Sequence, residues 1–409
     1  YESTDGYMKN INAVGGDNGR ENSALRLAGR WLATEDVTVD LMLMYEKEDL
    51  NIRSGIPSGT LHPFTFFRLG IREPIPDGVG FYPQNLDLVN HDVRSNSKNE
   101  LNLAIGTVDW RVTDSLTFTS ITAYGTRKLD RLVDGDRSSY DMFTSQADVE
   151  WTTKSQEFHL VGEAGNSVDW FLGVGWSEDQ EGPVLDITTN GADSPLIGQF
   201  GGPPFLGYEQ IEVGDREIVR VQEKREVWSV FGELTWHLNE QWWLSVGGRF
   251  TDETEEQIGE VSSDFGPSQD IGGTSKPVSD FRPRVAVHFD VTDNVNLYGV
   301  IATAIKPGIV ANDGTVLDDE KFTNYEAGAK GFMLDNRIRF GASIFYTEWD
   351  DLQVVTGEFN PGAGPPILTT RGNAADATAK GIELELDYRP VDPFLIRAAF
   401  GYLNAKFGS

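Results

Sequence analysis

The chain of 409 residues contains no cysteine, which excludes a disulfide framework, a thiolate metal site and a cysteine nucleophile. Basic residues are also scarce: 34 Lys and Arg stand against 64 Asp and Glu, for a formal net charge of −30. Binding to nucleic acid or to anionic lipid requires basic patches, so both partners are disfavoured. No apolar run approaches the ~18 residues that a membrane-spanning helix needs.

What the sequence does contain is a strict alternation of apolar and polar residues, which is clearest in the predicted hairpin at residues 322–349. Its two runs meet at Leu334-Asp335-Asn336, where Asp and Asn tolerate the left-handed backbone of a tight turn. In the second run one face is apolar, with Ile338, Phe340, Ala342, Ile344 and Tyr346. The other face carries Arg337, Arg339, Gly341, Ser343 and Thr347, with Phe345 as the apolar exception. Because a strand turns successive side chains to opposite sides, this segment is suited to oil on one face and water on the other.

The same two-faced pattern recurs along the chain and predicts about 15 strands, each near the ~10 residues of a tilted transmembrane strand. A first strand is expected over residues 1–11. Short turns alternate with long connections, the long ones near 49–98, 178–225, 254–279 and 351–379, and outer-membrane barrels place these outside the cell. A negative mean hydropathy does not contradict this, since every second residue of such a strand is polar. The sequence therefore predicts an all-β fold, an antiparallel up-and-down transmembrane β-barrel, as a single domain over residues 1–409.

Soluble propellers, sandwiches and β-solenoids are the alternative, because they also consist of many short strands. Those folds cover their apolar faces with a second sheet or with neighbouring blades, and they do not require alternating short and long connections. The chain has no fixed repeat period and no helical segment that could cover a sheet. The membrane barrel is therefore the favoured reading.

Several motifs resemble the barrel of TonB-dependent receptors, the energised ligand-uptake proteins of bacterial outer membranes. They occur in order over the second half of the chain, at residues 230–235, 247–253, 281–284, 298, 306–308, 325–331, 350–353, 373–374 and 381–385. Three departures stand out within these 409 residues: neither the family's plug domain with its TonB-contacting box nor a final strand ending in an aromatic residue is found. Ahead of Lys306 the family usually has Gly-Phe, where this chain has Ala304-Ile305.

The resemblance implies a barrel of about 22 strands, of which this chain supplies about 15, so that the sheet cannot close alone. It further implies a bacterial outer-membrane location and a monomer surrounded by outer-membrane lipid. TonB would act through a plug that lies outside these residues. The cargo would be a small molecule or an oligosaccharide: a ferric siderophore, a vitamin or a sugar.

Candidate ligand contacts lie in two of the long connections. The first set places aromatic rings among isolated arginines, which suits a partly apolar ligand with acidic or carbonyl groups. It comprises His62, Phe64, Phe66, Phe67, Arg68, Arg72, Phe81 and Tyr82. The second set comprises Phe200, Phe205 and Tyr208, grouped with Phe231. Alternatively, these rings merely pack the connections together.

No catalytic set, metal site or cofactor site is predicted. The histidines (His62, His91, His159, His237 and His288) are scattered without metal-ligand spacing. Glu383 and Glu385 would be neighbours on a water-facing strand surface. The acidic groups at residues 134–136 and 318–320 have no EF-hand register and are interpreted as solvated loop charge. Energised uptake is thus the leading function, a passive outer-membrane channel or surface-interaction barrel is the alternative, and an enzyme is disfavoured.

Overall fold

The computed structural model describes ten parts of the chain: residues 1–16, 18–51, 88–135, 141, 143–189, 212–264, 266–274, 277–309, 316–358 and 368–408. Every long regular element in these parts is a β-strand. No helix in them has the length and apolar character needed to cross a membrane.

The described strands follow one another along the chain. In chain order they are β1 (Glu2–Thr4), β2 (Lys9–Asn10), β3 (Arg20–Leu32), β4 (Val37–Leu50), β5 (Leu88–Val89), β6 (Asn96–Thr113), β7 (Leu116–Asp134), β8 (Phe143–Ala164), β9 (Val168–Thr189), β10 (Arg216–His237), β11 (Trp242–Ser263), β12 (Gln269–Thr274), β13 (Val278–Thr292), β14 (Val295–Lys306), β15 (Glu320–Met333), β16 (Ile338–Glu358), β17 (Leu368–Val391) and β18 (Phe394–Phe407).

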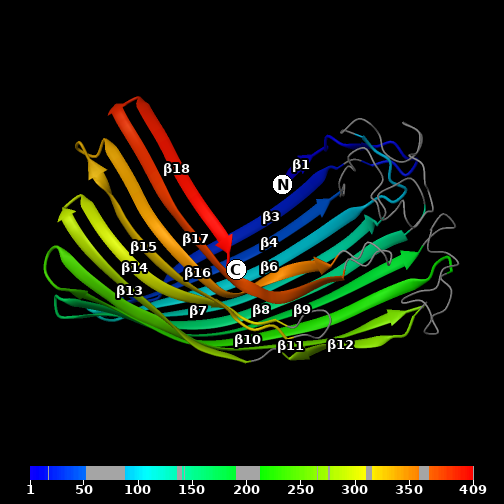
Figure 1. Cartoon of the computed structure of the whole chain (residues 1–409), viewed down its shortest axis with the longest axis horizontal. Helices are drawn as coiled ribbons and strands as arrows, with labels where there is room; N and C mark the ends of the chain where they lie inside the picture. Colours follow the sequence, from blue (N-terminus) through cyan, green and yellow to red (C-terminus); the bar gives the residue numbers. More distant parts are fainter. Residues whose placement is uncertain are drawn as a thin grey trace.

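One antiparallel sheet of 16 strands contains nearly all of them, and each long strand pairs with its neighbours in sequence. The short β12 pairs only with β11, while β2 and β5 form a separate parallel pair. Figure 1 shows the sheet curved into an open trough, with β18 at one edge and β1 and β3 at the other. The predicted up-and-down antiparallel fold is therefore confirmed, and the sheet does not close among the described residues.

Short and long connections lie at opposite ends of the trough (Figure 1). The short turns, such as residues 33–36, 114–115 and 238–241, join one set of hairpins, and the long connections join the other set. At the turn of residues 334–337, Leu334, Asp335 and Asn336 have φ angles of 52°, 51° and 63°. The left-handed backbone predicted for this turn is confirmed.

The strands extend further towards the long-connection end than the alternation indicated. The connection expected near 178–225 spans residues 190–215, because β9 and β10 remain paired up to Thr188 and Arg216. Similarly, β11 and β12 occupy much of 254–279, and β16 and β17 occupy much of 351–379. In these extensions polar side chains occupy both faces, so the alternation that identifies a strand is lost although the backbone pairing continues. At the N-terminus, the strand expected over residues 1–11 is two short ones, β1 and β2.

Apolar side chains form a continuous belt on the convex face. Cross-strand pairs align them from strand to strand: Val285 with Ile301, Ile301 with Tyr325, and Tyr325 with Tyr346. On β11 the belt residues Val246 and Phe250 are 46% and 43% exposed, whereas Ser245 and Thr251 on the opposite face are 5% and 2% exposed. Side chains crowd together on the concave face of a curved sheet and spread apart on the convex one.

Nothing in the described parts of the chain covers this belt. Ile344 is 58% exposed, and further large apolar residues on the same face are exposed to a similar degree. A soluble sandwich or propeller would bury them against a second layer of protein. Since the structure places no such layer on the convex face, the belt is suited to hydrocarbon.

The belt generates a test of which face meets lipid. In the full-length protein, Ile344→Arg should cost roughly 2–4 kcal/mol of folding free energy in lipid vesicles, because a cation would enter hydrocarbon near mid-depth. The matched change Ser343→Arg should cost little, because Ser343 lines a polar hollow on the other face. Urea unfolding in vesicles measures both variants. Equal losses at the two positions would contradict the assignment.

Candidate functional site: the concave polar face

The predicted ligand contacts lie outside the residues that the structure describes. The first set falls within residues 52–87, and Phe200, Phe205 and Tyr208 fall within 190–211. Both sets remain predictions. Phe231, which the sequence analysis grouped with the second set, is described and lies on β10. It lies 15 residues after Arg216, the first residue of β10, or about 50 Å along the strand. Phe231 is thus not part of that connection.

Phe231 instead forms an aromatic cluster on the concave wall. Its ring centroid lies 5.5 Å from that of Phe171 and 5.8 Å from that of His159. The guanidinium carbon of Arg249 lies 4.8 Å from the Phe231 ring centroid, a cation–π contact. The ring lies directly over Gly173, where any side chain would collide with it. Glycine at this position is what allows the ring to lie flat against the wall.

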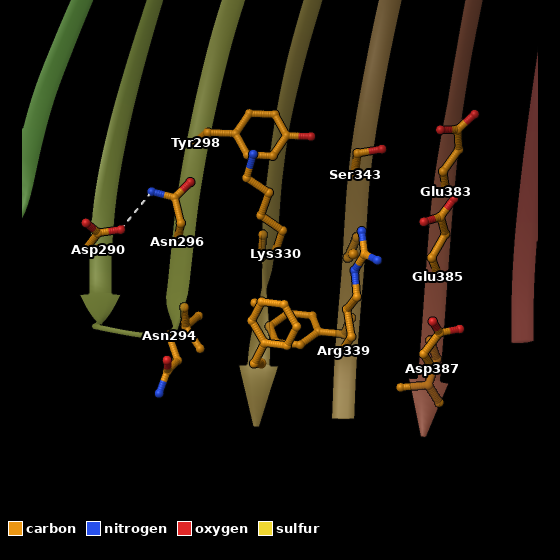
Figure 2. A pocket seen from close by; sticks show the side chains of 18 of the residues that line it. Asp290, Asn294, Asn296, Tyr298, Lys330, Arg339, Ser343, Glu383, Glu385 and Asp387 are labelled. Carbon is orange, nitrogen blue, oxygen red and sulfur yellow. Dashed lines mark hydrogen bonds between the residues drawn. The ribbon is translucent and has the colours of Figure 1, made fainter. Parts of the chain in front are cut away.

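A polar hollow of about 730 Å³ lies on the concave face near the short turns, on strands β13 to β17. Figure 2 shows its labelled side chains, among them Tyr298, Lys330, Arg339, Ser343 and the column Glu383, Glu385 and Asp387 on β17. The sequence analysis predicted that Glu383 and Glu385 face water, and both line this hollow.

Tyr298 organises one wall of the hollow. Its hydroxyl donates a hydrogen bond of 2.7 Å to Glu326 Oε1, and the Lys330 ammonium lies 5.7 Å from its ring centroid. The phenol lies across Gly328, where a Cβ atom would stand 2.6 Å from the Tyr298 hydroxyl oxygen. Nearby, Asn296 Nδ2 donates to Asp290 Oδ1 at 3.1 Å, as Figure 2 shows.

The hollow is acidic. Six carboxylates line it, on Asp290, Asp293, Glu326, Glu383, Glu385 and Asp387, against the cations Lys330 and Arg339. Asp387 is partly neutralised by Arg397, whose Nε lies 3.5 Å from its Oδ1. No group of three His, Asp or Glu side chains in the described residues could hold a metal ion. These groups can offer hydrogen bonds and charge to a polar partner.

The remaining sequence candidates have structural partners. His237 lies 2.7 Å from Asp169 Oδ2 near the short turns, which fits the prediction of a wet-face residue. Asp134 is fully buried, with its backbone N–H donating to Ser95 Oγ, and Glu320 is 6% exposed. The interpretation of these two as solvated loop charge is therefore wrong, because each belongs to a hydrogen-bonded rim at the long-connection end.

An ion pair braces the ends of the connection that carries Phe200, Phe205 and Tyr208. Arg216 binds Asp186 of β9 through its guanidinium, and its backbone N–H donates to Asp264 Oδ2 at 3.0 Å. This pair lies beyond the apolar belt, close to the end of both strands. The guanidinium of Arg216 holds the pKa of Asp186 below its ordinary value, because it stabilises the carboxylate by hydrogen bonding and charge.

The family model described as "TonB dependent receptor-like, beta-barrel" matches residues 33–409. The chain belongs to this family. Its members are outer-membrane β-barrel proteins of Gram-negative bacteria, so the apolar belt lies in the outer membrane. The relatives are receptors, and the long connections of this family barrel lie on the outer side.

Individual relatives of this TonB-dependent receptor barrel share only part of its sequence. The pesticin receptor of Yersinia enterocolitica is 29% identical over 176 residues, which cover 40% of this chain and 24% of that receptor. The ferric-pyoverdine 358 receptor of Pseudomonas putida is 30% identical over 105 residues, or 25% of this chain and 13% of that receptor. The chain therefore spans well under two thirds of the relatives that it matches.

The crystal structure of the ferric yersiniabactin uptake receptor FyuA from Yersinia pestis superposes with a TM-score of 0.72 at 16% identity. The similarity covers all of this chain and 55% of FyuA. At that level of identity the likeness establishes the fold alone. It supports the reading of the open trough as the wall of a β-barrel.

Sequence reasoning found the polar face of the hollow but missed its key contacts. Alternation places Arg339 and Ser343 on the wet side of β16, and Glu383 and Glu385 on the wet side of β17. The contact of Tyr298 with Glu326 across Gly328 depends on the register between β14 and β15, which a single sequence does not reveal. A glycine among inward-facing residues, opposite an inward-facing tyrosine, was the available signal.

The tyrosine–glycine contact predicts different outcomes for two glycines of the same wall. Gly328→Ala places a methyl group against both the Tyr298 hydroxyl and the Ala342 carbonyl, each 2.6 Å away. It should destabilise the full-length barrel by about 1–3 kcal/mol through overpacking. Gly341→Ala should be neutral, because its nearest neighbour would be Glu385 Cβ at 3.9 Å. Unfolding midpoints in vesicles measure the difference, and equal effects would show that the contact imposes no constraint.

Proposed function

We propose that this chain is the barrel part of a receptor that takes up a ferric siderophore through the outer membrane, energised by TonB through a plug domain. The observation that carries the proposal is the family match over residues 33–409, together with relatives named for ferric yersiniabactin uptake and ferric pyoverdine. The long connections would capture the cargo outside. The barrel would provide a wet passage, and transport rather than catalysis would be its task.

The charge distribution supports uptake of a specific cargo over passive passage. Carboxylates dominate the hollow on the concave wall, and the whole chain carries a formal charge of −30. A wall of that sign repels anionic solutes. A passive channel for anionic metal chelates would instead be lined with cations.

Growth under iron limitation tests the proposal. The full-length gene is expressed in a Gram-negative host whose own siderophore receptors are deleted, with ferric yersiniabactin, ferric pyoverdine or ferric citrate as the only iron source. We expect at least one compound to restore growth, and only while TonB is present. Growth that persists without TonB would favour the passive channel, and no growth with any compound would contradict a siderophore cargo of these classes.

The predicted contacts of the first long connection give a sharper test. Replacing both Arg68 and Arg72 by Ala should weaken binding of the effective ferric compound at least about tenfold, because each hydrogen bond to a charged group contributes roughly 1.5–3 kcal/mol. Arg389→Ala is the matched control, since Arg389 is exposed at the opposite, short-turn end. Titration of purified receptor by tryptophan fluorescence measures the affinity. An unchanged affinity in the double variant would exclude these arginines from the site.

A further inference from the structure

Three short motifs from different parts of the sequence meet at the long-connection end. They are residues 306–308 at the end of β14, residues 350–353 on β16 and residues 373–374 on β17. The connection between β14 and β15 has two described legs, 307–309 and 316–319, and both lie against the β16–β17 pair. None of these motifs belongs to the aromatic cluster around Phe231 or to the polar hollow described above.

A β-bulge in β16 sets the positions of the side chains that contact the two legs. The register between β16 and β17 shifts between Trp349 and Leu352 and again before Gln353. Asp351 takes a left-handed backbone with a φ of 57°. After the shifts, Gln353 stands directly opposite Asn373. A bulge of this kind redirects side chains, and here it sets two carboxamides side by side.

Asn373 binds the second leg in the manner of a peptide group. Its Oδ1 accepts a 2.8 Å hydrogen bond from the Asp318 N–H, and its Nδ2 donates to the Asp318 carbonyl at 2.9 Å. The same Nδ2 donates to the Asp351 carbonyl at 2.7 Å. One side chain thus fixes both the leg and the bulge.

Gln353 joins the two legs to each other. Its Nε2 donates to the Pro307 carbonyl at 2.9 Å and to the Asp318 carbonyl at 3.1 Å. Its backbone N–H donates to Glu320 Oε2 at 3.1 Å, and Lys306 Nζ lies 3.3 Å from the same oxygen. The first leg is closed by Gly308, whose N–H donates to Asp319 Oδ1 at 2.8 Å.

We infer that Gln353 and Asn373 are positioning residues that clamp both legs of the β14–β15 connection onto the bulged β16–β17 pair. The clamp, defined as Lys306, Asp318, Glu320, Gln353 and Asn373, holds the two described legs, 307–309 and 316–319, in fixed positions against β16 and β17. Three elements, β14, β16 and β17, are joined through carboxamides that reach backbone carbonyls. The inference does not depend on which cargo the receptor carries.

Hydrogen exchange of the full-length protein, followed by mass spectrometry of peptides that span 305–320, tests the clamp. The protected amides are those of Gly308, Leu317 and Asp318, which donate to Asp319 Oδ1, the Ile309 carbonyl and Asn373 Oδ1. Gln353→Met keeps the length of the side chain and removes its donors, and Asn373→Asp removes the donors while keeping the acceptor. Each variant should speed exchange of these amides about fivefold or more, as expected for the loss of hydrogen bonds worth roughly 1 kcal/mol each.

Gln222→Met is the matched control, because Gln222 is an exposed residue of β10, which pairs with β9 and β11 and not with the clamped strands, and its exchange pattern should equal that of the unaltered protein. The effect of the clamp variants should be confined to residues 305–320 and the facing part of β16 and β17, with the unfolding midpoint of the barrel nearly unchanged. Unaltered exchange at 305–320 in both clamp variants would overturn the inference. So would a uniform acceleration along the barrel, which would mean that these residues stabilise the fold as a whole. Since the readout needs no cargo, failure of the growth experiment would leave this result unaffected.

Discussion

A strand in hydrocarbon can satisfy its backbone hydrogen bonds only through neighbouring strands, and this requirement determines the rest of the architecture. It demands continuous antiparallel pairing, which joins the strands from β3 to β18, apart from β5, in one sheet by short and long connections in turn. It also fixes register, because a shift of one residue would turn Ile344 inward and Ser343 towards lipid. The same alternation that produces the belt therefore produces the wet wall, and the two cannot vary independently.

The wet wall is built by pairing large inward side chains with glycines on the next strand. Tyr298 crosses Gly328 to reach Glu326, and Phe231 lies over Gly173. In the same way Glu233 of β10 binds Arg284 of β13 at 2.5 Å across the intervening strand β11, where Gly247 leaves the space open. In these contacts the side chain either reaches across an intervening strand or lies flat against a neighbouring one. On a concave surface, where side chains crowd, this arrangement gives polar and aromatic groups room without opening the backbone ladder.

The sequence predicted those features that alternation alone determines. Three features follow from the identities of residues that are close in sequence, because polarity and turn preference are properties of single residues. They are the facing of residues 338–347, the left-handed turn at Leu334 to Asn336 and the succession of short and long connections. The ends of β9, β10, β16 and β17 were not predictable in this way. Beyond the belt both faces are wet, so the pattern ends while the pairing continues.

Contacts between distant motifs were beyond the sequence for a different reason. Lys306, Asp351, Gln353 and Asn373 were recognised as parts of family-like motifs, yet their meeting depends on two register shifts in one strand pair. Glu320 illustrates the consequence: as sequence it is one of three adjacent acids, and in the fold it is a buried acceptor for Gln353 and Lys306. The local pattern indicated a solvent-exposed carboxylate for Glu320, and this was wrong because its partners Lys306 and Gln353 lie 14 and 33 residues away in the sequence.

The negative charge of the chain has a structural distribution that bears on how a cargo is held. On the described walls many of the cations are already engaged, as where Lys154 and Lys224 both bind Glu178 at 2.8 and 2.9 Å, or where Arg225 binds Glu253. With acids in excess, the carboxylates left over collect on wet surfaces such as the hollow beside Glu383 and Glu385. A general field of this sign cannot attract an anionic chelate. The proposed capture of an anionic chelate would therefore rest on a few local contacts strong enough to overcome this field, which a receptor site would provide and a diffusion pore would not.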